Sequence, residues 1–140
     1  MKWLRGSWQR DEGRVSLLVA VVVPALLFLI AAVVDAGGQV RAMQRADNIA
    51  AQAARTAGQQ IDYPQAISGG IKVIDPQRAV AAAQEYLREA GATGTVTVSP
   101  NRQQITVSAA ITYQPLMLGV FGRGSVSITG QSSAQLVTGP

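Results

Sequence analysis

An uncharged apolar run near the N-terminus constrains this chain more than any other feature. It extends from Val15 to Val34, and its only hydroxyl side chain is Ser16. A helix needs about 20 apolar residues to cross the hydrocarbon core of a bilayer, and this run has that length. The remaining chain is too short and too polar to enclose such a helix. We therefore predict one membrane-spanning helix over residues 15–36 and not a buried core helix.

The residues that flank the apolar run predict its orientation. Four basic residues and two tryptophans precede it: Lys2, Arg5, Arg10, Arg14, Trp3 and Trp8. Basic residues favour the cytoplasmic side, and tryptophan favours the membrane interface. Arginines also follow the run, but long segments translocate largely regardless of charge. We expect residues 1–14 to be a cytoplasmic N-terminus and the chain from residue 37 onward to be extracytoplasmic.

A cleaved secretory signal is the alternative to a retained membrane anchor. Val34-Asp35-Ala36 has the small flanking residues of a cleavage site, and the segment before the run is basic. The apolar region of a signal peptide is usually about 7–15 residues, however, which is shorter than this run. We favour the retained anchor, and the domain that follows is exported in both cases.

The composition excludes several classes of function. The chain has no cysteine and no histidine, so thiol and histidine catalysis, haem attachment and nearly all zinc sites are excluded. The sequence contains no phosphate-binding loop, nucleophile elbow or cluster of metal ligands. The net charge of +4 is divided equally between residues 1–14 and residues 15–140, and neither part has a dense basic stripe. We predict no nucleic-acid binding, no enzyme activity, no catalytic residue, no cofactor and no metal.

An acidic residue and two glycines, Asp35, Gly37 and Gly38, follow the outer end of the run and are candidate interaction residues. A carboxylate at the edge of an apolar helix is costly unless it reaches water or a partner. We therefore expect Asp35 to lie at the outer headgroup level, to pair with a basic group of a neighbouring subunit, or to orient the exit of the helix from the membrane. Each glycine weakens a helix by about 1 kcal/mol relative to alanine. The pair marks a bend or the close approach of another helix.

A second helical pattern begins at Val40 and ends near Gly58, before Tyr63-Pro64. Small residues recur on one face of it at helical spacing, among them the candidate interaction residues Ala46, Ala50, Ala53 and Ala57. A seam of alanines buries little area but lets two backbones approach closely. We predict a helical extension over residues 37–60 whose alanine seam contacts either this chain's own domain or another subunit.

The rest of the chain, residues 61–140, has the pattern of an exported α+β domain. Residues 61–75 are predicted to form a loop. Asp75 is suited to cap a helix and Pro76 to begin one, and Gly91 is suited to follow its end. The apolar stripe expected on this helix consists of Val80, Ala83, Tyr86 and Leu87.

Apolar and polar residues alternate over residues 95–99, 105–113 and 126–136, and this alternation predicts three strands. The predicted fold class is α+β. It has a long N-terminal transmembrane helix that extends into an exported domain, where one further helix, Asp75–Ala90, packs on a three-stranded antiparallel sheet. The loop before the last strand is apolar and holds the candidate interaction residues Leu116, Met117, Leu118 and Phe121. It either closes the open end of the sheet or meets a partner or the membrane surface.

The order of these segments resembles that of TadE/TadG-like proteins. The resemblance rests on residues 11–16, the apolar run with Pro24, the segment Val33–Gly38, and the following helix rich in Ala, Arg and Gln. The later Ala-rich helix, the Gly-Thr-Val-Thr-Val strand at 94–98 and the Leu-Gly-Val-Phe-Gly loop at 118–122 are similar too. The resemblance is to the actinobacterial branch and covers most of the chain.

The resemblance implies a minor pilin, a pseudopilin or an assembly component of a tight-adherence (Tad/Flp) type IV pilus. Its implied partners are other pilin or pilus-assembly subunits and the lipid bilayer, and its implied place is the cell membrane or surface fibres. Type IV prepilins are typically cut after a glycine, with Glu as the fifth mature residue, whereas the fifth residue after Gly13 is Leu18. Gly13 is therefore not predicted to be a cleavage site. The alternative function is a membrane-anchored extracytoplasmic adaptor or receptor module that never enters a fibre.

Overall fold

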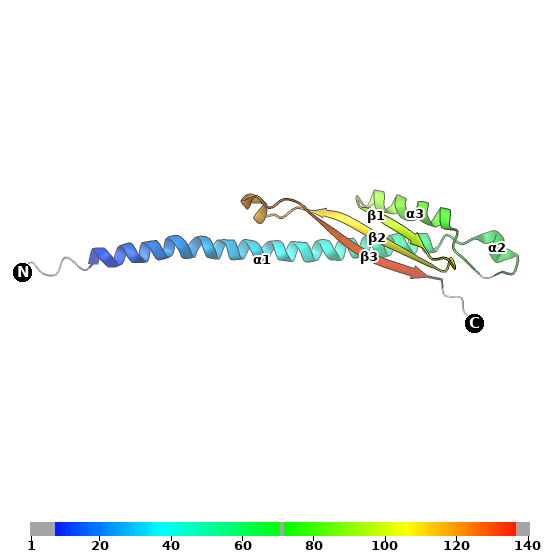
Figure 1. Cartoon of the computed structure of the whole chain (residues 1–140), viewed down its shortest axis with the longest axis horizontal. Coiled ribbons are helices and arrows are strands. Elements are labelled where there is room, and N and C mark those ends of the chain that lie inside the picture. The colour runs from blue at the N-terminus through cyan, green and yellow to red at the C-terminus, as the bar shows by residue number, and fades with distance from the viewer. Residues whose placement is uncertain (1–7, 71, 137–140) are drawn as a thin grey trace, which may run out of the picture.

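The computed structural model describes residues 8–70 and 72–136. Residues 1–7 of the predicted cytoplasmic N-terminus, and residues 137–140, lie outside the described part. The dominant element is helix α1, Trp8–Gly58, which has 51 residues and is about 75 Å long at the usual rise per residue. Its first half extends alone, and its second half runs along the remaining elements (Figure 1). The chain therefore has the shape of a rod with a small domain packed along one end.

Helix α1 passes through Gly37-Gly38 without interruption. The expected bend at these glycines is wrong. Within this chain a strand residue, Tyr113, packs over Gly38; the approach of another subunit's helix stays a prediction. The helical cost of about 1 kcal/mol per glycine does not interrupt a helix whose C-terminal half is held by the sheet and α3. Pro24 also lies inside α1.

Three strands form one antiparallel sheet in the order β1-β2-β3, as the alternation predicted. They are β1 (Thr93–Val98), β2 (Gln104–Tyr113) and β3 (Val126–Gln135). Val96 lies opposite Val107 in the first pair, and Ile111 lies opposite Ile128 in the second. The predicted α+β fold with a three-stranded antiparallel sheet is confirmed.

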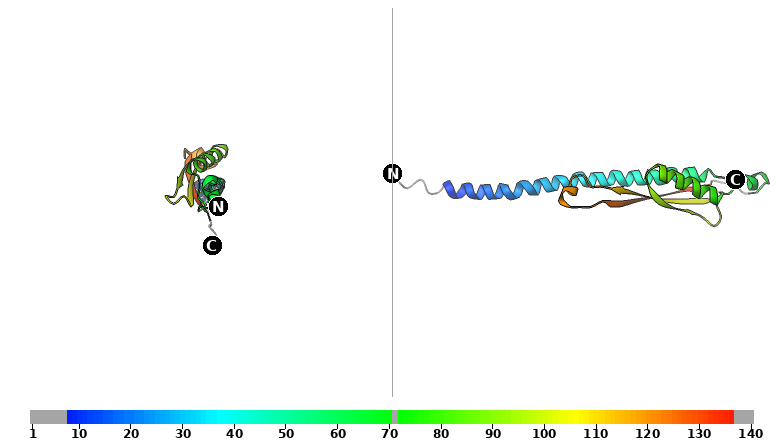
Figure 2. Two further views of the ribbon diagram at one scale, coloured as in Figure 1. Left: turned by 90° about the vertical axis from the view of Figure 1, so that its right-hand side faces the viewer. Right: turned by 90° about the horizontal axis from the view of Figure 1, so that it is seen from above.

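Two helices cover one face of this sheet. Helix α1 packs on β2 and β3, and helix α3 (Pro76–Glu89) packs on β1 and on α1 (Figure 2). The side chains of Ile105, Val107 and Ala109 point from β2 into this core and are fully buried. The sequence predicted the second helix on the sheet and left open whether the alanine seam of α1 contacts this chain's own domain or another subunit. In the structure α1 supplies the larger cover, because its alanine seam packs closely against β2 and β3.

Strand β3 crosses α1 very closely at Gly130. A methyl group at this position would overlap the backbone of Ala46 and Asp47. Only glycine lets the two backbones approach to this distance, because the atoms in the way belong to a rigid helix and cannot rotate aside. The close crossing explains why position 46, which is fully buried beneath the strand, carries alanine.

The connections differ from the predicted loops in two places. Residues 61–75, predicted as a loop, contain a short helix, α2 (Tyr63–Ile67), which Asp62 caps through the amide of Gln65. The helix forms because the Asp62 carboxylate caps its first turn and Pro64 favours that turn, although the glycines that follow favour a loop. The apolar segment between β2 and β3 contains a 3₁₀ helix, η1 (Leu118–Phe121).

The apolar stripe of α3 also differs from the predicted one. Ala79 is fully buried, whereas Val80, which was expected on the stripe, is only half-buried.

Candidate functional site

One face of α1 packs against the rest of the described chain. Its buried positions recur at helical spacing, at Ala31, Asp35, Ala46, Ile49, Ala50, Ala53, Ala54 and Ala57. The side chains before Ala31, from Val15 to Ile30, are all exposed to solvent in the isolated chain. The boundary between free helix and packed helix therefore falls near Ala31.

Asp35 is buried, with 1% of its surface exposed, and its carboxylate accepts three backbone hydrogen bonds. Oδ1 accepts from the amides of Leu116 (2.8 Å) and Met117 (3.1 Å), and Oδ2 accepts from the amide of Leu118 (2.6 Å). Three donors in sequence around one carboxylate form an anion-binding concavity. We call this cluster, Asp35 with the amides of residues 116–118, the Asp35 contact.

The loop that binds Asp35 comprises residues 114–125, which we call the η1 loop. Met117 precedes η1 but makes no side-chain cap hydrogen bond, and the amide of Leu118, the first residue of η1, donates to an acceptor outside the loop. The carboxylate of Asp35 supplies that acceptor from another element, as a capping side chain would. Gly122, at φ 85°, ends η1 in the left-handed region that favours glycine. The loop is thus fixed to α1 at its beginning.

Tyr113, the last residue of β2, makes a second contact beside the Asp35 contact. Its hydroxyl donates to the backbone carbonyl of Asp35 at 3.2 Å. Its ring lies against Gly38, where any added methyl group would overlap the phenol. Of the two adjacent glycines, Gly38 is therefore the one whose missing side chain leaves room for the ring of Tyr113. Gly37 has open space around it.

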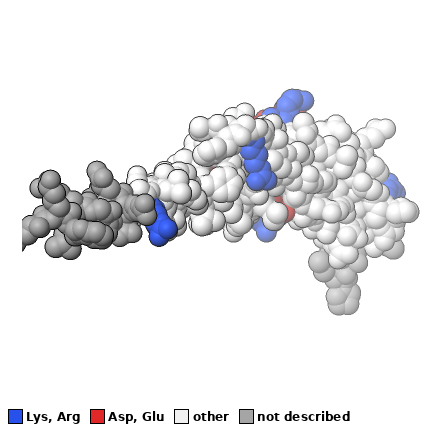
Figure 3. Space-filling view, turned by 60° about the vertical axis from the view of Figure 1, so that its left-hand side comes forward, with Lys and Arg blue, Asp and Glu red and all other residues white. Residues whose placement is uncertain are grey.

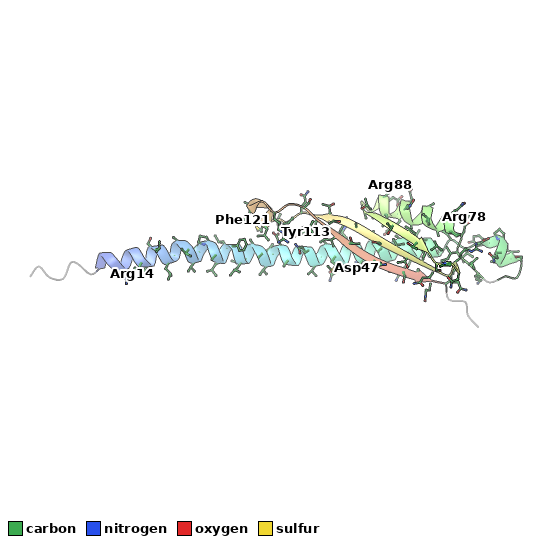
Figure 4. The ribbon with its side chains drawn as sticks, viewed as in Figure 1. Arg14, Asp47, Arg78, Arg88, Tyr113 and Phe121 are labelled. Carbon is green, nitrogen blue, oxygen red and sulfur yellow. The ribbon has the colours of Figure 1, made fainter. Side chains whose placement is uncertain are left out.

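From the Asp35 contact, the η1 loop extends alongside α1 toward the N-terminal end of that helix and reaches its tip at Phe121 (Figure 4). The ring of Phe121 packs edge-on against the ring of Phe28, with centroids 5.9 Å apart and an interplanar angle of 78°. Leu118 is buried, but Leu116, Met117 and Phe121 are exposed by 73%, 44% and 68%. The loop therefore turns one apolar side chain inward and presents the others to the surroundings.

The predicted interaction residues thus separate into three groups. Asp35, Gly38 and Leu118 lie together where the η1 loop meets α1. The alanine seam is buried in this chain's own core, with Ala46, Ala50, Ala53 and Ala57 all at 0% exposure. Gly37 and the outward apolar side chains of the loop remain exposed.

Sequence reasoning missed Phe28, Tyr113 and Gly130. The spacing of positions 28, 31, 35 and 38 continues into the alanine seam at 42 and 46, so one unbroken helical face could have been recognised. The partners of Asp35 could not, because backbone amides carry no residue-type signal. They lie more than eighty positions further along the chain.

The free half of α1 is long and apolar enough to span a membrane. On the face shown in Figure 3, uncharged atoms cover the helix between the basic patch beside its grey N-terminal segment and the domain. Among the residues that the structure describes, no group of three or more Asp, Glu, His or Cys side chains is placed to hold a metal ion. The fold and the site define a class of protein: a small α+β domain on one long apolar helix, as fits a membrane-anchored protein.

Comparison with known families agrees with this class. Residues 13–60 match the Tad family model, described as Flp pilus-assembly TadE/G-like. The TadE/TadG resemblance is confirmed over this segment, which contains the apolar run, Asp35 and the alanine seam. It implies a component associated with the Tad pilus. The sheet and the η1 loop lie beyond the matched segment. No curated protein and no solved structure matches the chain.

Proposed function

We propose that this protein is a minor pilin-like subunit of a Tad pilus, with its N-terminus in the cytoplasm and its α+β domain outside. Its role is structural: it joins pilus assembly through helix packing and protein–protein contacts, without catalysis. The observation that carries the proposal is the division of a single helix into two halves. One half is apolar and exposed over residues 15–30, and the other forms part of the core of a folded domain.

A helix with this free half is poorly suited to water and well suited to two other surroundings. In the bilayer, lipid tails cover its apolar side chains. In a fibre, the same side chains pack against the equivalent helices of neighbouring subunits. A subunit that is stored in the membrane and then extracted into a filament needs a helix that is stable in both surroundings. The match of residues 13–60 to Flp pilus-assembly proteins supports this interpretation.

The proposal is tested by shearing intact cells and probing both the released fibres and the membranes for the protein. The N-terminal sequence is read from each fraction. Recovery in fibres is expected, and the N-terminus then establishes whether the chain is processed. A protein that stays wholly in the membrane, uncut, would contradict the pilin role and favour the anchored adaptor or a fixed assembly factor.

A pair of variants separates the role of the helix from that of the domain. Leu26→Arg places a charge in the middle of the free half of α1, at a cost of about 3 kcal/mol for membrane insertion. Ile67→Arg adds the same charge at an exposed position of α2. We expect the first variant to be lost from both membranes and fibres. The second is expected to distribute as the natural protein does.

A further inference from the structure

We propose that the η1 loop inserts its exposed side chains among the lipid acyl chains of the membrane leaflet on the domain side. The inference rests on the proposed membrane insertion of α1. It assigns to the domain a second contact with the bilayer, besides the helix. The proposal follows from the depth of the loop, from its surface and from the pairing of its backbone.

The depth of the loop follows from the contact between Phe121 and Phe28. Phe28 lies six residues before Val34, where the uncharged run ends. At 1.5 Å per residue, that places Phe28 about 9 Å inside the apolar span. The loop tip beside it lies at the same level, within the outer part of the hydrocarbon region. In Figure 1 the loop (orange-brown) is the part of the domain that lies nearest the free half of α1.

The surface of the loop at that level is apolar. The segment Pro115–Gly122 contains no charged and no hydroxyl or amide side chain. Val120 is exposed by 83% and Phe121 by 68%, although both are large and apolar. In water such a patch is unfavourable, whereas among acyl chains it continues the lipid-facing surface of α1. Arg123 follows directly, and its long side chain can reach the headgroup phosphates.

Most backbone amides of the loop tip are paired within the protein. Irregular backbone is tolerated at membrane depth only where its polar groups are satisfied within the protein. The Asp35 contact pairs the amides of residues 116–118. The amides of Val120, Gly122 and Arg123 donate to carbonyls within the loop. The buried carboxylate thus has a definite role, because it pairs three amides that would otherwise oppose insertion.

Single-cysteine variants test the proposal, because the natural chain has no cysteine and each introduced thiol is unique. Val120→Cys reports on the loop, and Ile67→Cys is its matched control, since both side chains are 83% exposed in the isolated chain. Val21→Cys reports on the apolar run. The full-length variants, labelled with an environment-sensitive fluorophore, are reconstituted into phosphatidylcholine vesicles with and without brominated acyl chains.

Brominated lipid is expected to quench the fluorophore at positions 120 and 21 and to leave position 67 unquenched. A water-soluble quencher should show the reverse order. If position 21 is quenched and position 120 behaves like position 67, the loop lies in water, and the inference fails while the membrane anchor stands. If position 21 also escapes brominated lipid, both proposals fail. Disulfide cross-linking of the unlabelled Val120→Cys variant to a second copy, without lipid quenching of the labelled one, would show a protein contact and overturn the inference.

Discussion

The close crossing of β3 and α1 predicts that Gly130→Ala is severely destabilising, although it adds a single methyl group. The added Cβ overlaps the backbone of Ala46 and Asp47, so relief requires the strand to move away from the helix. Overpacking of a core costs about 1–3 kcal/mol. We expect the upper end, about 3 kcal/mol, because backbone atoms cannot rotate aside as side chains can.

The matched control for this prediction is Gly37→Ala. A methyl group at Gly37 meets nothing within 4 Å. Alanine favours the helix by about 1 kcal/mol over glycine, so this variant should be slightly stabilised. The two substitutions are chemically identical, and we expect their unfolding free energies to differ by about 4 kcal/mol.

Thermal unfolding of the full chain in mild detergent, followed by circular dichroism, measures both variants. For a domain of this size, 1 kcal/mol corresponds to about 4–8 °C in Tm, so Gly130→Ala should melt at least about 12 °C below the natural protein. Gly37→Ala should melt at or slightly above it. If Gly130→Ala melts within about 2 °C of the natural protein, then β3 and α1 are not in backbone contact and the reasoning is refuted.

Three further predictions test other parts of the structure. Ile105→Ala leaves a cavity in the core and should cost about 3 kcal/mol in the same melts, whereas Ile67→Ala at an exposed site should change Tm little. Asp75→Ala removes the cap of α3 and should cost about 1 kcal/mol, while Asp75→Asn keeps an acceptor and should cost less, a difference that urea titration resolves. Asp35→Asn replaces one of two acceptor oxygens by a donor, so hydrogen exchange at the amide of Leu118 should accelerate roughly tenfold; unchanged exchange would contradict the Asp35 contact.

Much of the fold could be predicted because its signals are local. The alternation along β2 specifies which side chains face the core, whatever covers them. The Asp75-Pro76 pair indicates the start of α3 because cap and first turn depend on adjacent residues. The short helix α2 was missed because its five residues are too few to show a periodic pattern.

The candidate site was predicted only in part. Asp35 and Gly38 were recognised as unusual residues at the end of an apolar run, but the sequence offered a bend, a second helix or a neighbouring subunit as reasons. The structure supplies a different one, a loop and a tyrosine from the same chain. Gly37 and Gly38 are adjacent and alike in sequence, and only the position of Tyr113 distinguishes them.

The sequence by itself determined the apolar run, the strands, the start of α3 and the absence of cysteine and histidine chemistry. These follow from residue types and short-range spacing, which act before any distant segment is in place. Only the tertiary structure decided that the alanine seam is internal, that Gly130 lies against Ala46, and that Asp35 holds the η1 loop. Each of these depends on residues far apart in the chain, and in the last case on backbone amides that every residue except proline possesses.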